Sequence, residues 1–281
     1  MLQKIHPIDY LLIGHVTEDL LPDGQTRVGG TVSFSGLTAH ALGHQVGVVT
    51  SCRPDTRLDA LNQLQIHALP AAETTTFRNI PSETGRQQFM YRRAELLSEV
   101  SIPENFRQAA IVHLGPVADE IDPELHKIFP DSMICLTPQG WLRGFEEDGR
   151  VKPVGWRYSH DILKASHAAV LSLEDVNGEE DLIDEFAAFC KVLVVTENKY
   201  GARVYWNGDV HRFPAPSVDL VDDTGSGDIF AACFFHRYIA TRDPWEAARF
   251  AVELASLSVT RTYFDSIPAR KEIESAKTQI L

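Results

Sequence analysis

The sequence has few cysteines, no long apolar run and no excess of basic residues. Its cysteines at positions 52, 135, 190 and 233 are far apart and have apolar neighbours, which favours reduced core thiols over a disulfide framework or a zinc site. No run approaches the roughly 20 apolar residues of a membrane span, and the N-terminus lacks the apolar stretch of a signal peptide. The formal net charge of -13 opposes binding to phosphate-rich surfaces. We therefore expect a cytoplasmic protein that binds neither nucleic acid nor membrane.

The composition and the order of structural signals predict one α/β core. With 44% hydrophobic and 23% charged residues among 281, the chain has the composition of an ordinary globular protein. Short apolar runs typical of buried strands occupy residues 8–13, 45–50, 110–114, 133–137, 168–173 and 192–196. A helix is expected from the Gly29-Gly30 pair through Leu42, with Gly43 at its C-terminal cap. This alternation favours a mainly parallel sheet covered by helices.

Two hairpins are expected outside that alternation. Polar and aromatic residues alternate in 74–93 around a central turn, which indicates a hairpin with one face in water. The Asn207-Gly208 pair is a strong signal for a second, tight hairpin. Helices are expected after Asp228, at 229–239, 244–260 and 269–280. Because no internal repeat or flexible linker is evident, residues 1–281 are predicted to form a single domain with a small β appendage.

The segment 221–230 carries the strongest chemical signal. It runs from a turn of small residues into a helix that is apolar almost all round. A helix N-terminus presents free N–H groups and partial positive charge, so the small residues Gly225, Ser226 and Gly227 would let a phosphate reach the backbone. The Asp228 carboxylate, next in sequence, could accept the proton of an attacking hydroxyl, and an ordinary carboxylate pKa suffices for that role.

Other interpretations of this segment remain open on spacing alone. Asp-Thr-Gly clusters also form turns and helix caps that bind no ligand. A dinucleotide-binding fingerprint would need a third glycine at a fixed offset, and a P-loop would need its lysine, and both are missing here.

The loop resembles the C-terminal signature of the ribokinase-like, phosphofructokinase-B family of carbohydrate kinases. Four further features resemble that family in the right order: Asp19 after the first strand, the Gly29-Gly30 pair that begins a helix, the segment 194–202 and the segment 259–261. The resemblance implies a three-layer αβα sandwich with a mainly parallel central sheet and a small β lid. The lid would comprise residues of about 19–28 and 74–93, and it could also pair two subunits into a homodimer.

The family's activity implies an ATP-dependent kinase that phosphorylates a hydroxyl of a sugar or polyol, with Asp228 as general base. ATP and its anionic groups would be bound by Thr224, Gly225, Ser226, Gly227, Thr196 and Gly201. The acceptor would be bound by Asp19, Gly29, Gly30, Ser33, Phe34 and Arg86. Mg²⁺ is implied, with Asp175 acting on it through water, and so is a monovalent cation near Asp222.

Three departures from the family pattern limit what the resemblance implies. Phe34 stands where asparagine is usual, so we expect an apolar wall in place of a hydroxyl contact. The Asn-x-x-Glu motif appears as Ser172-Leu173-Glu174-Asp175, and the segment 136–143 replaces an aspartate-led one. The segment 136–143, together with Asn198 where glycine is usual, resembles the inositol-kinase-like branch of the family. Because the apolar wall at Phe34 suits the carbon face of a ring, an inositol or a nucleoside is expected to be a better acceptor than ribose. The alternative from another class is a non-catalytic ligand-binding protein on the same fold.

Overall fold

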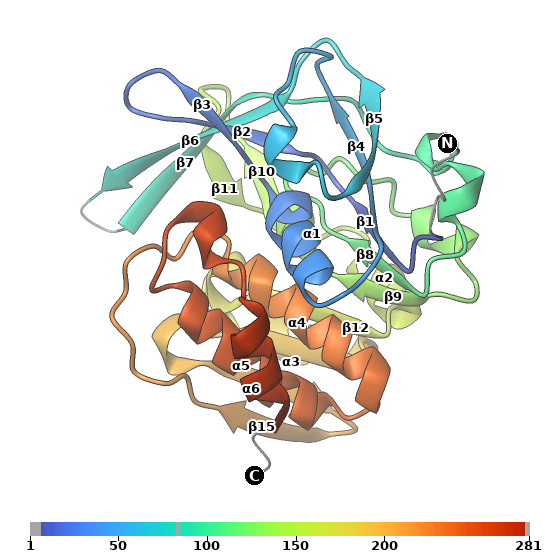
Figure 1. Ribbon diagram of the computed structural model, residues 1–281, viewed down its shortest axis with the longest axis vertical. Helices are drawn as coiled ribbons and strands as arrows, with labels where there is room; N and C mark the ends of the chain where they lie inside the picture. The colour runs from blue at the N-terminus through green and yellow to red at the C-terminus, as the bar shows by residue number, and fades with distance from the viewer. Residues whose placement is uncertain (1–6, 83–84, 279–281) are drawn as a thin grey trace.

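The computed structural model describes residues 7–82 and 85–278, which form three layers around a central sheet (Figure 1). The described strands of this sheet follow the order β15-β14-β13-β12-β9-β8-β1-β4-β5. Neighbours from β13 through β5 pair in parallel, and β14 and β15 add an antiparallel edge. The bounds are β1 Tyr10–Ile13, β4 Val46–Cys52, β5 Gln65–Pro70, β8 Ile111–Leu114, β9 Met133–Leu136, β12 Ala168–Ser172, β13 Val192–Thr196, β14 Ala202–Trp206 and β15 Asp209–Phe213.

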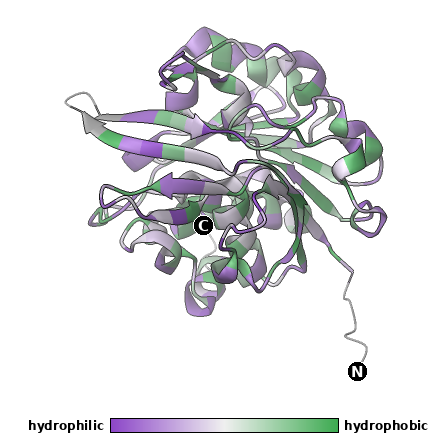
Figure 2. Cartoon of the chain, turned by 90° about the horizontal axis from the view of Figure 1, so that it is seen from above, coloured by the Kyte–Doolittle hydropathy of each residue, from purple (hydrophilic) through white to green (hydrophobic). Residues whose placement is uncertain are grey.

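Helices cover both faces of the sheet. One face carries α1 (Thr31–Ala41), α4 (Ser226–Thr241), α5 (Pro244–Ser258) and α6 (Arg270–Thr278), and the other carries α2 (Ser159–Ala165) and α3 (Glu180–Phe189). Because successive side chains of a strand point to opposite faces, Val192 and Val194 join the first core while Leu193 and Val195 join the second. Both faces are buried, which explains why these strands are almost uniformly apolar. Figure 2 shows the hydrophobic residues gathered along the central strands.

A second sheet projects from one edge of the molecule (Figure 1). Its strand order within the described residues is β3-β2-β6-β7, with bounds β2 Thr17–Leu20, β3 Thr26–Gly29, β6 Thr75–Ser82 and β7 Gly85–Arg92. The antiparallel β6–β7 pair confirms the hairpin expected at 74–93. The parallel pairing of β2 with β6 joins this hairpin to the segment that follows β1.

The sequence-based expectations for the fold are confirmed, with differences at its margins. The αβα sandwich, the mainly parallel sheet and the apolar strands are present, and α1 ends before Gly43, which has a φ of 102°. The edge strand β5 and the small hairpin β10 (Arg143–Phe145) and β11 (Val151–Pro153) were not expected. Between β8 and β9 the described chain forms only a 3₁₀ turn, Leu125–Ile128, as its helical element.

Two further expectations concern local chemistry. Asn207 and Gly208 have φ values of 53° and 87°, as the tight turn between β14 and β15 requires. All the cysteines are free and buried, as expected of reduced core thiols. Within residues 7–82 and 85–278, no helix combines the length and the apolar character needed to cross a membrane.

Candidate active site

A cavity of about 230 Å³ lies where the carboxyl ends of the parallel strands meet the first turns of α1 and α4 and the second sheet. Open α/β sheets bind ligands at this edge, because the loops that follow the strands converge there. Among the residues expected from the sequence, its wall includes Asp19, Gly30, Phe34, Asp175, Thr196, Thr224, Gly225, Ser226, Gly227 and Asp228. The structure therefore brings together residues that are more than 200 positions apart in the chain.

Four other expected residues are not on the described wall of this cavity: Gly29, Ser33, Arg86 and Gly201. The Ser33 hydroxyl is buried and donates to the Gly29 carbonyl at 2.6 Å, within the first turn of α1. Gly201 has a φ of 95° and shapes the turn into β14, where an added Cβ would lie 1.9 Å from the Phe213 carbonyl oxygen. Arg86 lies in β7 opposite Pro81, and its side chain falls outside the described part of the chain.

The Asp222 carboxylate fixes the conformation of the loop before α4. Its carboxylate accepts hydrogen bonds from the backbone N–H of Thr224 at 2.9 Å and of Tyr263 at 3.3 Å. Burial acts to raise the pKa of Asp222, but the hydrogen bonds outweigh it and hold the pKa below its ordinary value. Asp222 thus braces the turn, within which the Ser226 N–H donates to the Asp223 carbonyl at 3.1 Å.

Gly225 is the tightest point of this loop. Its φ of 79° is left-handed, and an added Cβ would lie 2.2 Å from Cδ1 of Phe34. Phe34 is 2% exposed, and its ring also packs edge-on against Tyr263 and Phe264, with centroid distances of 6.0 and 5.0 Å. Phe34 touches the cavity, as expected, but most of its ring supports the backbone of the loop. By contrast, a Cβ on Gly227 would meet no atom within 4 Å.

Asp228 is the third residue of α4, in its first turn, and remains partly exposed to the cavity. Burial raises its pKa to about 6, although a hydrogen bond from Thr31 and the charge of Arg143 act in the opposite direction. The nearby carboxylate of Asp175 raises the pKa further. The carboxylate is therefore ionised at neutral pH, but it titrates well above the ordinary range that sequence reasoning assumed.

Arg143 is the functional candidate that sequence reasoning missed. It opens β10, donates to the Val117 carbonyl at 3.3 Å and lies over the Phe77 ring at 5.9 Å. It lines the cavity, and its charge lowers the pKa of both Asp175 and Asp228. Its only sequence signal was its place at the end of the divergent segment 136–143.

Asp175 is fixed by its neighbours. Its carboxylate accepts from the Ser172 backbone N–H at 2.8 Å and from the Gln139 side-chain amide at 3.1 Å. Burial raises its pKa despite those hydrogen bonds and the charge of Arg143. Next to it, Glu174 lines the cavity and accepts from the Asn198 amide at 2.7 Å.

The donor set fits Mg²⁺ held largely by phosphate and water. The described residues contain no cluster of three or more His, Cys, Asp or Glu side chains that could hold a metal. Asp175 still offers a carboxylate whose charge is disfavoured by burial and would be favoured by a cation. Mg²⁺ commonly keeps several waters and takes one or two carboxylates, so this arrangement suits it.

The second sheet places polar groups across the cavity from the loop that precedes α4. Asp19 lines the cavity from β2 and lies 3.9 Å from Arg27 in β3. A Cβ on Gly29 would approach the Asp19 carboxylate at 3.0 Å, so glycine there leaves room for it. From the hairpin, Asn79 and Gln88 also line the cavity, and the Gln88 side-chain amide donates a hydrogen bond to Oδ1 of Asn79 at 3.1 Å.

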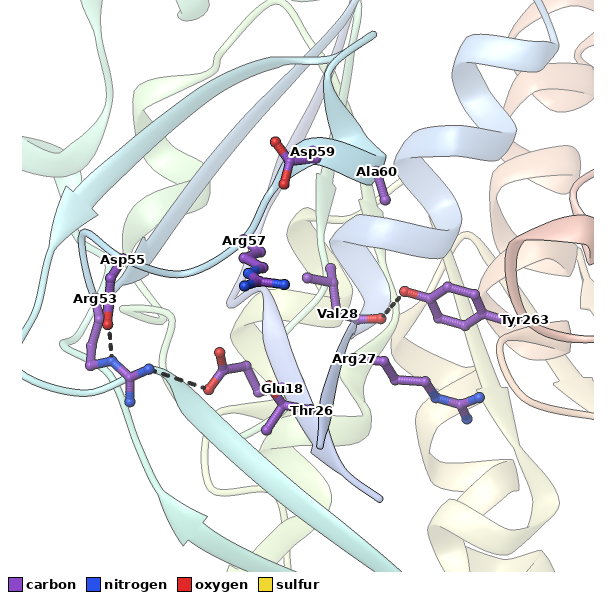
Figure 3. Close-up of a pocket in the computed structure, with 10 residues that line it drawn as sticks. All are labelled: Glu18, Thr26, Arg27, Val28, Arg53, Asp55, Arg57, Asp59, Ala60 and Tyr263. Carbon is purple, nitrogen blue, oxygen red and sulfur yellow. Dashed lines mark hydrogen bonds and ion pairs between the residues drawn. The ribbon is translucent and has the colours of Figure 1, made fainter. Parts of the chain in front are cut away.

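The opposite face of the β2–β3 pair bounds a second hollow of about 470 Å³ (Figure 3). There Glu18 lies 3.9 Å from Arg53, which also pairs with Asp55 at 2.9 Å. The Tyr263 hydroxyl closes one side by donating to the Val28 carbonyl at 2.6 Å. Because Glu18 and Asp19 are adjacent in a strand, they face these two different hollows.

Comparisons with known proteins agree on one family. Residues 159–270 match the family model described as "pfkB family carbohydrate kinase". A cytidine kinase of Thermococcus kodakarensis is 25% identical over 88% of this chain and 95% of its own. A fructokinase of Escherichia coli is 25% identical over 90% and 88%, and an inositol 3-kinase of Zea mays is 24% identical over 97% and 79%.

Solved structures share the fold over nearly the whole chain. A pyrophosphate-dependent kinase of the ribokinase family, in a sulfate complex, superposes with a TM-score of 0.80 at 22% identity, covering 95% of this chain and 99% of that one. A ribokinase of Arabidopsis thaliana, complexed with ribose and ATP, has a TM-score of 0.74 at 17% identity, covering 98% and 100%. At these identities the likeness concerns the fold.

The contact between Gly225 and Phe34 generates a stability prediction. We expect Gly225→Ala to destabilise the protein by about 2 kcal/mol or more, because it adds left-handed strain to a steric clash. Gly227→Ala, at an open position on the same turn, serves as the matched control and should change stability by less than about 1 kcal/mol. Urea unfolding of both variants measures the difference. Equal stabilities would show that the loop can move away from Phe34 at little cost.

Proposed function

Since the chain belongs to the pfkB family of carbohydrate kinases, we propose that it transfers the γ-phosphoryl group of ATP to a ring-borne hydroxyl of an inositol, nucleoside or sugar. The observation that carries this proposal is the position of Asp228. Its carboxylate stands in one cavity with residues 223–227 of the loop that precedes α4 (the phosphate loop), the cation Arg143 and the polar groups of the second sheet.

Asp228 acts as the general base. A hydrogen bond from Thr31 orients its carboxylate, and with a pKa of about 6 the group is ionised at neutral pH yet more basic than an ordinary aspartate. A general base is most effective when its pKa lies near the operating pH, because it is then largely deprotonated and still has a high affinity for a proton. The acceptor hydroxyl loses its proton to Asp228 as its oxygen bonds to phosphorus.

The phosphate loop and Arg143 stabilise the negative charge of the transferring group. The N–H groups of Gly225, Ser226 and Gly227 belong to the start of α4, where the helix dipole adds positive charge. Arg143 supplies a full charge from the opposite wall. Phosphoryl transfer depends mainly on such positioning and electrostatic stabilisation.

Asp175 would hold Mg²⁺ through water, and the cation would offset the negative charge of the phosphate groups. A monovalent cation near Asp222 is a further proposal, and it would screen the loop that Asp222 braces. Thr196 and Gly201 are proposed to border the nucleotide, Thr196 from the cavity wall and Gly201 through the turn that it shapes.

The second sheet is proposed to act as a lid within a single domain. Its segments 19–28 and 74–93 bring Asp19, Asn79 and Gln88 over the cavity, where they could bind acceptor hydroxyls. Phe34 and Phe77 add apolar surface suited to the carbon face of a ring. The outer strand β3 ends the described sheet, and the edge of β7 is covered in part by the hydrogen bond from the Met90 N–H to the Gly149 carbonyl at 2.8 Å, so a homodimer is proposed to form through β3.

Surface near the loop supports ATP as donor. Val218, Leu220 and Val221 directly precede the phosphate loop and are 36%, 67% and 58% exposed. Exposed aliphatic side chains beside an anion site suit a nucleotide base, which pyrophosphate lacks. Pyrophosphate is nevertheless the second candidate donor, since a structural neighbour is named as a pyrophosphate-dependent kinase.

A donor and acceptor matrix tests this assignment. ATP and pyrophosphate are each paired with myo-inositol, cytidine, fructose and ribose, and the phosphorylated product is detected by ³¹P NMR. We expect ATP with myo-inositol or cytidine to give the fastest turnover and ribose the slowest. Turnover with pyrophosphate as donor but not with ATP would overturn the donor assignment. Absence of turnover with every donor and acceptor pair would contradict the proposed activity.

Asp228→Asn tests the general base. We expect a loss of about a hundredfold to ten-thousandfold in kcat with nearly unchanged ATP binding. Asp219→Asn, an exposed carboxylate exchange on the preceding segment, is the matched control. Wild-type kcat/KM should rise with pH through about 6, the pKa of Asp228 in the free protein. Wild-type turnover in Asp228→Asn would remove this residue from the mechanism.

The same variant gives an independent readout in stability. Because folding raises the pKa of Asp228 from 3.8 to about 6, its ionisation destabilises the folded state as the pH rises through that interval. Asparagine does not ionise, so the Asp228→Asn protein does not lose this stability as the pH rises. We therefore expect the Tm of Asp228→Asn relative to wild type to be higher at pH 8 than at pH 5, and a pH-independent difference would show that Asp228 is well solvated.

A further inference from the structure

A chain of hydrogen-bonded side chains crosses the core and ends at the cavity. Tyr10 in β1 and His113 in β8 are fully buried, and Thr137 follows β9 on the cavity wall. The Tyr10 hydroxyl lies 3.2 Å from Nδ1 of His113, and Nε2 of His113 lies 2.9 Å from Oγ1 of Thr137. The strands β1, β8 and β9 are parallel neighbours, so this series of hydrogen bonds runs from Tyr10, at the start of β1, toward the carboxyl end of β9.

The direction of these hydrogen bonds follows from burial. Burial lowers the pKa of His113 to about 3, so its ring is neutral and has one donor and one acceptor nitrogen. Within residues 7–82 and 85–278, His113 is the one hydrogen-bond partner found for the Tyr10 hydroxyl. If Nδ1 donated to Tyr10, the phenolic proton would be left without an acceptor in the core, which is costly. Tyr10 therefore donates to Nδ1, and the imidazole proton is on Nε2.

This tautomer fixes the orientation of the threonine hydroxyl. Because Nε2 of His113 donates, Thr137 Oγ1 accepts, and the hydroxyl proton of Thr137 must be donated elsewhere. No acceptor for that proton is found in the described part of the chain. The open direction is the cavity that Thr137 lines.

Thr137 also lies close to the group that holds the base. Gly115 separates Thr137 from Thr31: a Cβ on Gly115 would approach Thr31 Cγ2 at 2.6 Å and Thr137 Oγ1 at 3.2 Å. Thr31 in turn donates to Asp228. A ligand oxygen that accepts from Thr137 therefore belongs to the part of the ligand nearest the reacting hydroxyl.

We propose that Thr137 is a specificity-determining residue that donates a hydrogen bond to an acceptor-substrate oxygen close to the reacting hydroxyl, and that Tyr10 and His113 are positioning residues that enforce this donation. The inference rests on the proposed kinase function. It assigns the substrate an oxygen with a free lone pair at this position, such as a neighbouring hydroxyl of a polyol or nucleoside sugar. A substrate analogue that carries hydrogen in place of this oxygen would lose the contact.

Kinetics of three variants test the proposal. Thr137→Val keeps the shape and removes the hydroxyl, and we expect it to raise KM for the acceptor about fivefold to tenfold with KM for the donor unchanged. Thr137→Ser should recover most of this loss. Thr38→Val, which removes a buried hydroxyl bonded to the Phe34 carbonyl, is the matched control and should leave KM for the acceptor unchanged. An unchanged acceptor KM in Thr137→Val, or a rise in the donor KM instead, would overturn the assignment.

Tyr10→Phe separates positioning from packing. Without the phenol, His113 can move its proton to Nδ1, and Thr137 can then donate to Nε2 and turn away from the cavity. We expect an increase in acceptor KM in the same direction as in Thr137→Val but smaller, and no further increase when the two changes are combined. Additive effects would show that Tyr10 acts through general packing.

The tautomer itself can be measured without any substrate. In ¹⁵N-histidine-labelled protein, the His113 signal, assigned by its loss in His113→Gln, should show a proton on Nε2, and a proton on Nδ1 would overturn the proposal. This result does not depend on turnover. A protein with the Nε2 tautomer but no kinase activity would refute the proposed function, whereas an active kinase with the Nδ1 tautomer would refute the role of Thr137.

Discussion

The contact of the Phe34 ring with the Gly225 backbone joins the two ends of the chain at the candidate active site. Phe34 belongs to α1 and Gly225 caps α4, and glycine leaves the space that the ring occupies. Tyr263 and Phe264 hold the ring from the other side, and the Tyr263 N–H also bonds Asp222. The loop proposed to bind phosphate, the position of Asp228 and the packing of both helices therefore depend on one aromatic cluster.

The electrostatics of the cavity counter the net charge of the protein. A chain with a net charge of -13 repels phosphates at long range, and the carboxylates of Asp175 and Asp228 add local negative charge. In the proposed reaction, Arg143, the helix N-terminus and a cation would provide the compensating positive charge. The same balance tunes the base: burial and Asp175 raise the pKa of Asp228, while Thr31 and Arg143 limit the rise to about 6.

Local sequence signals predicted the parallel sheet covered by helices, the hairpin and the turn that leads into α4, because each depends on residues close together in the chain. Long-range contacts were not predictable in this way. The inward position of Arg143 depends on β10 and on the carbonyl of Val117, and no periodicity indicates it. Phe34 was expected to form an apolar wall for the acceptor, but its packing against Gly225 is a contact across 191 positions (225 minus 34). The alternation in 74–93 predicted strands, but not the pairing of β6 with β2, which sets Asp19 beside Phe77.

In the proposed site, phosphate and acceptor would be bound by different kinds of groups. This difference is compatible with relatives of the same fold that are named for different acceptors. Groups that would bind phosphate are largely backbone N–H groups, which substitution of side chains leaves in place. Groups that would bind the acceptor are side chains from the second sheet and from the loop after β9, including Asp19, Gln88 and Thr137. A side-chain exchange at these positions alters hydrogen bonding to the acceptor without disturbing α4. Thr137 differs from the others because its hydroxyl is oriented from inside the core, so a change at Tyr10, fully buried in β1, can alter acceptor recognition from a distance.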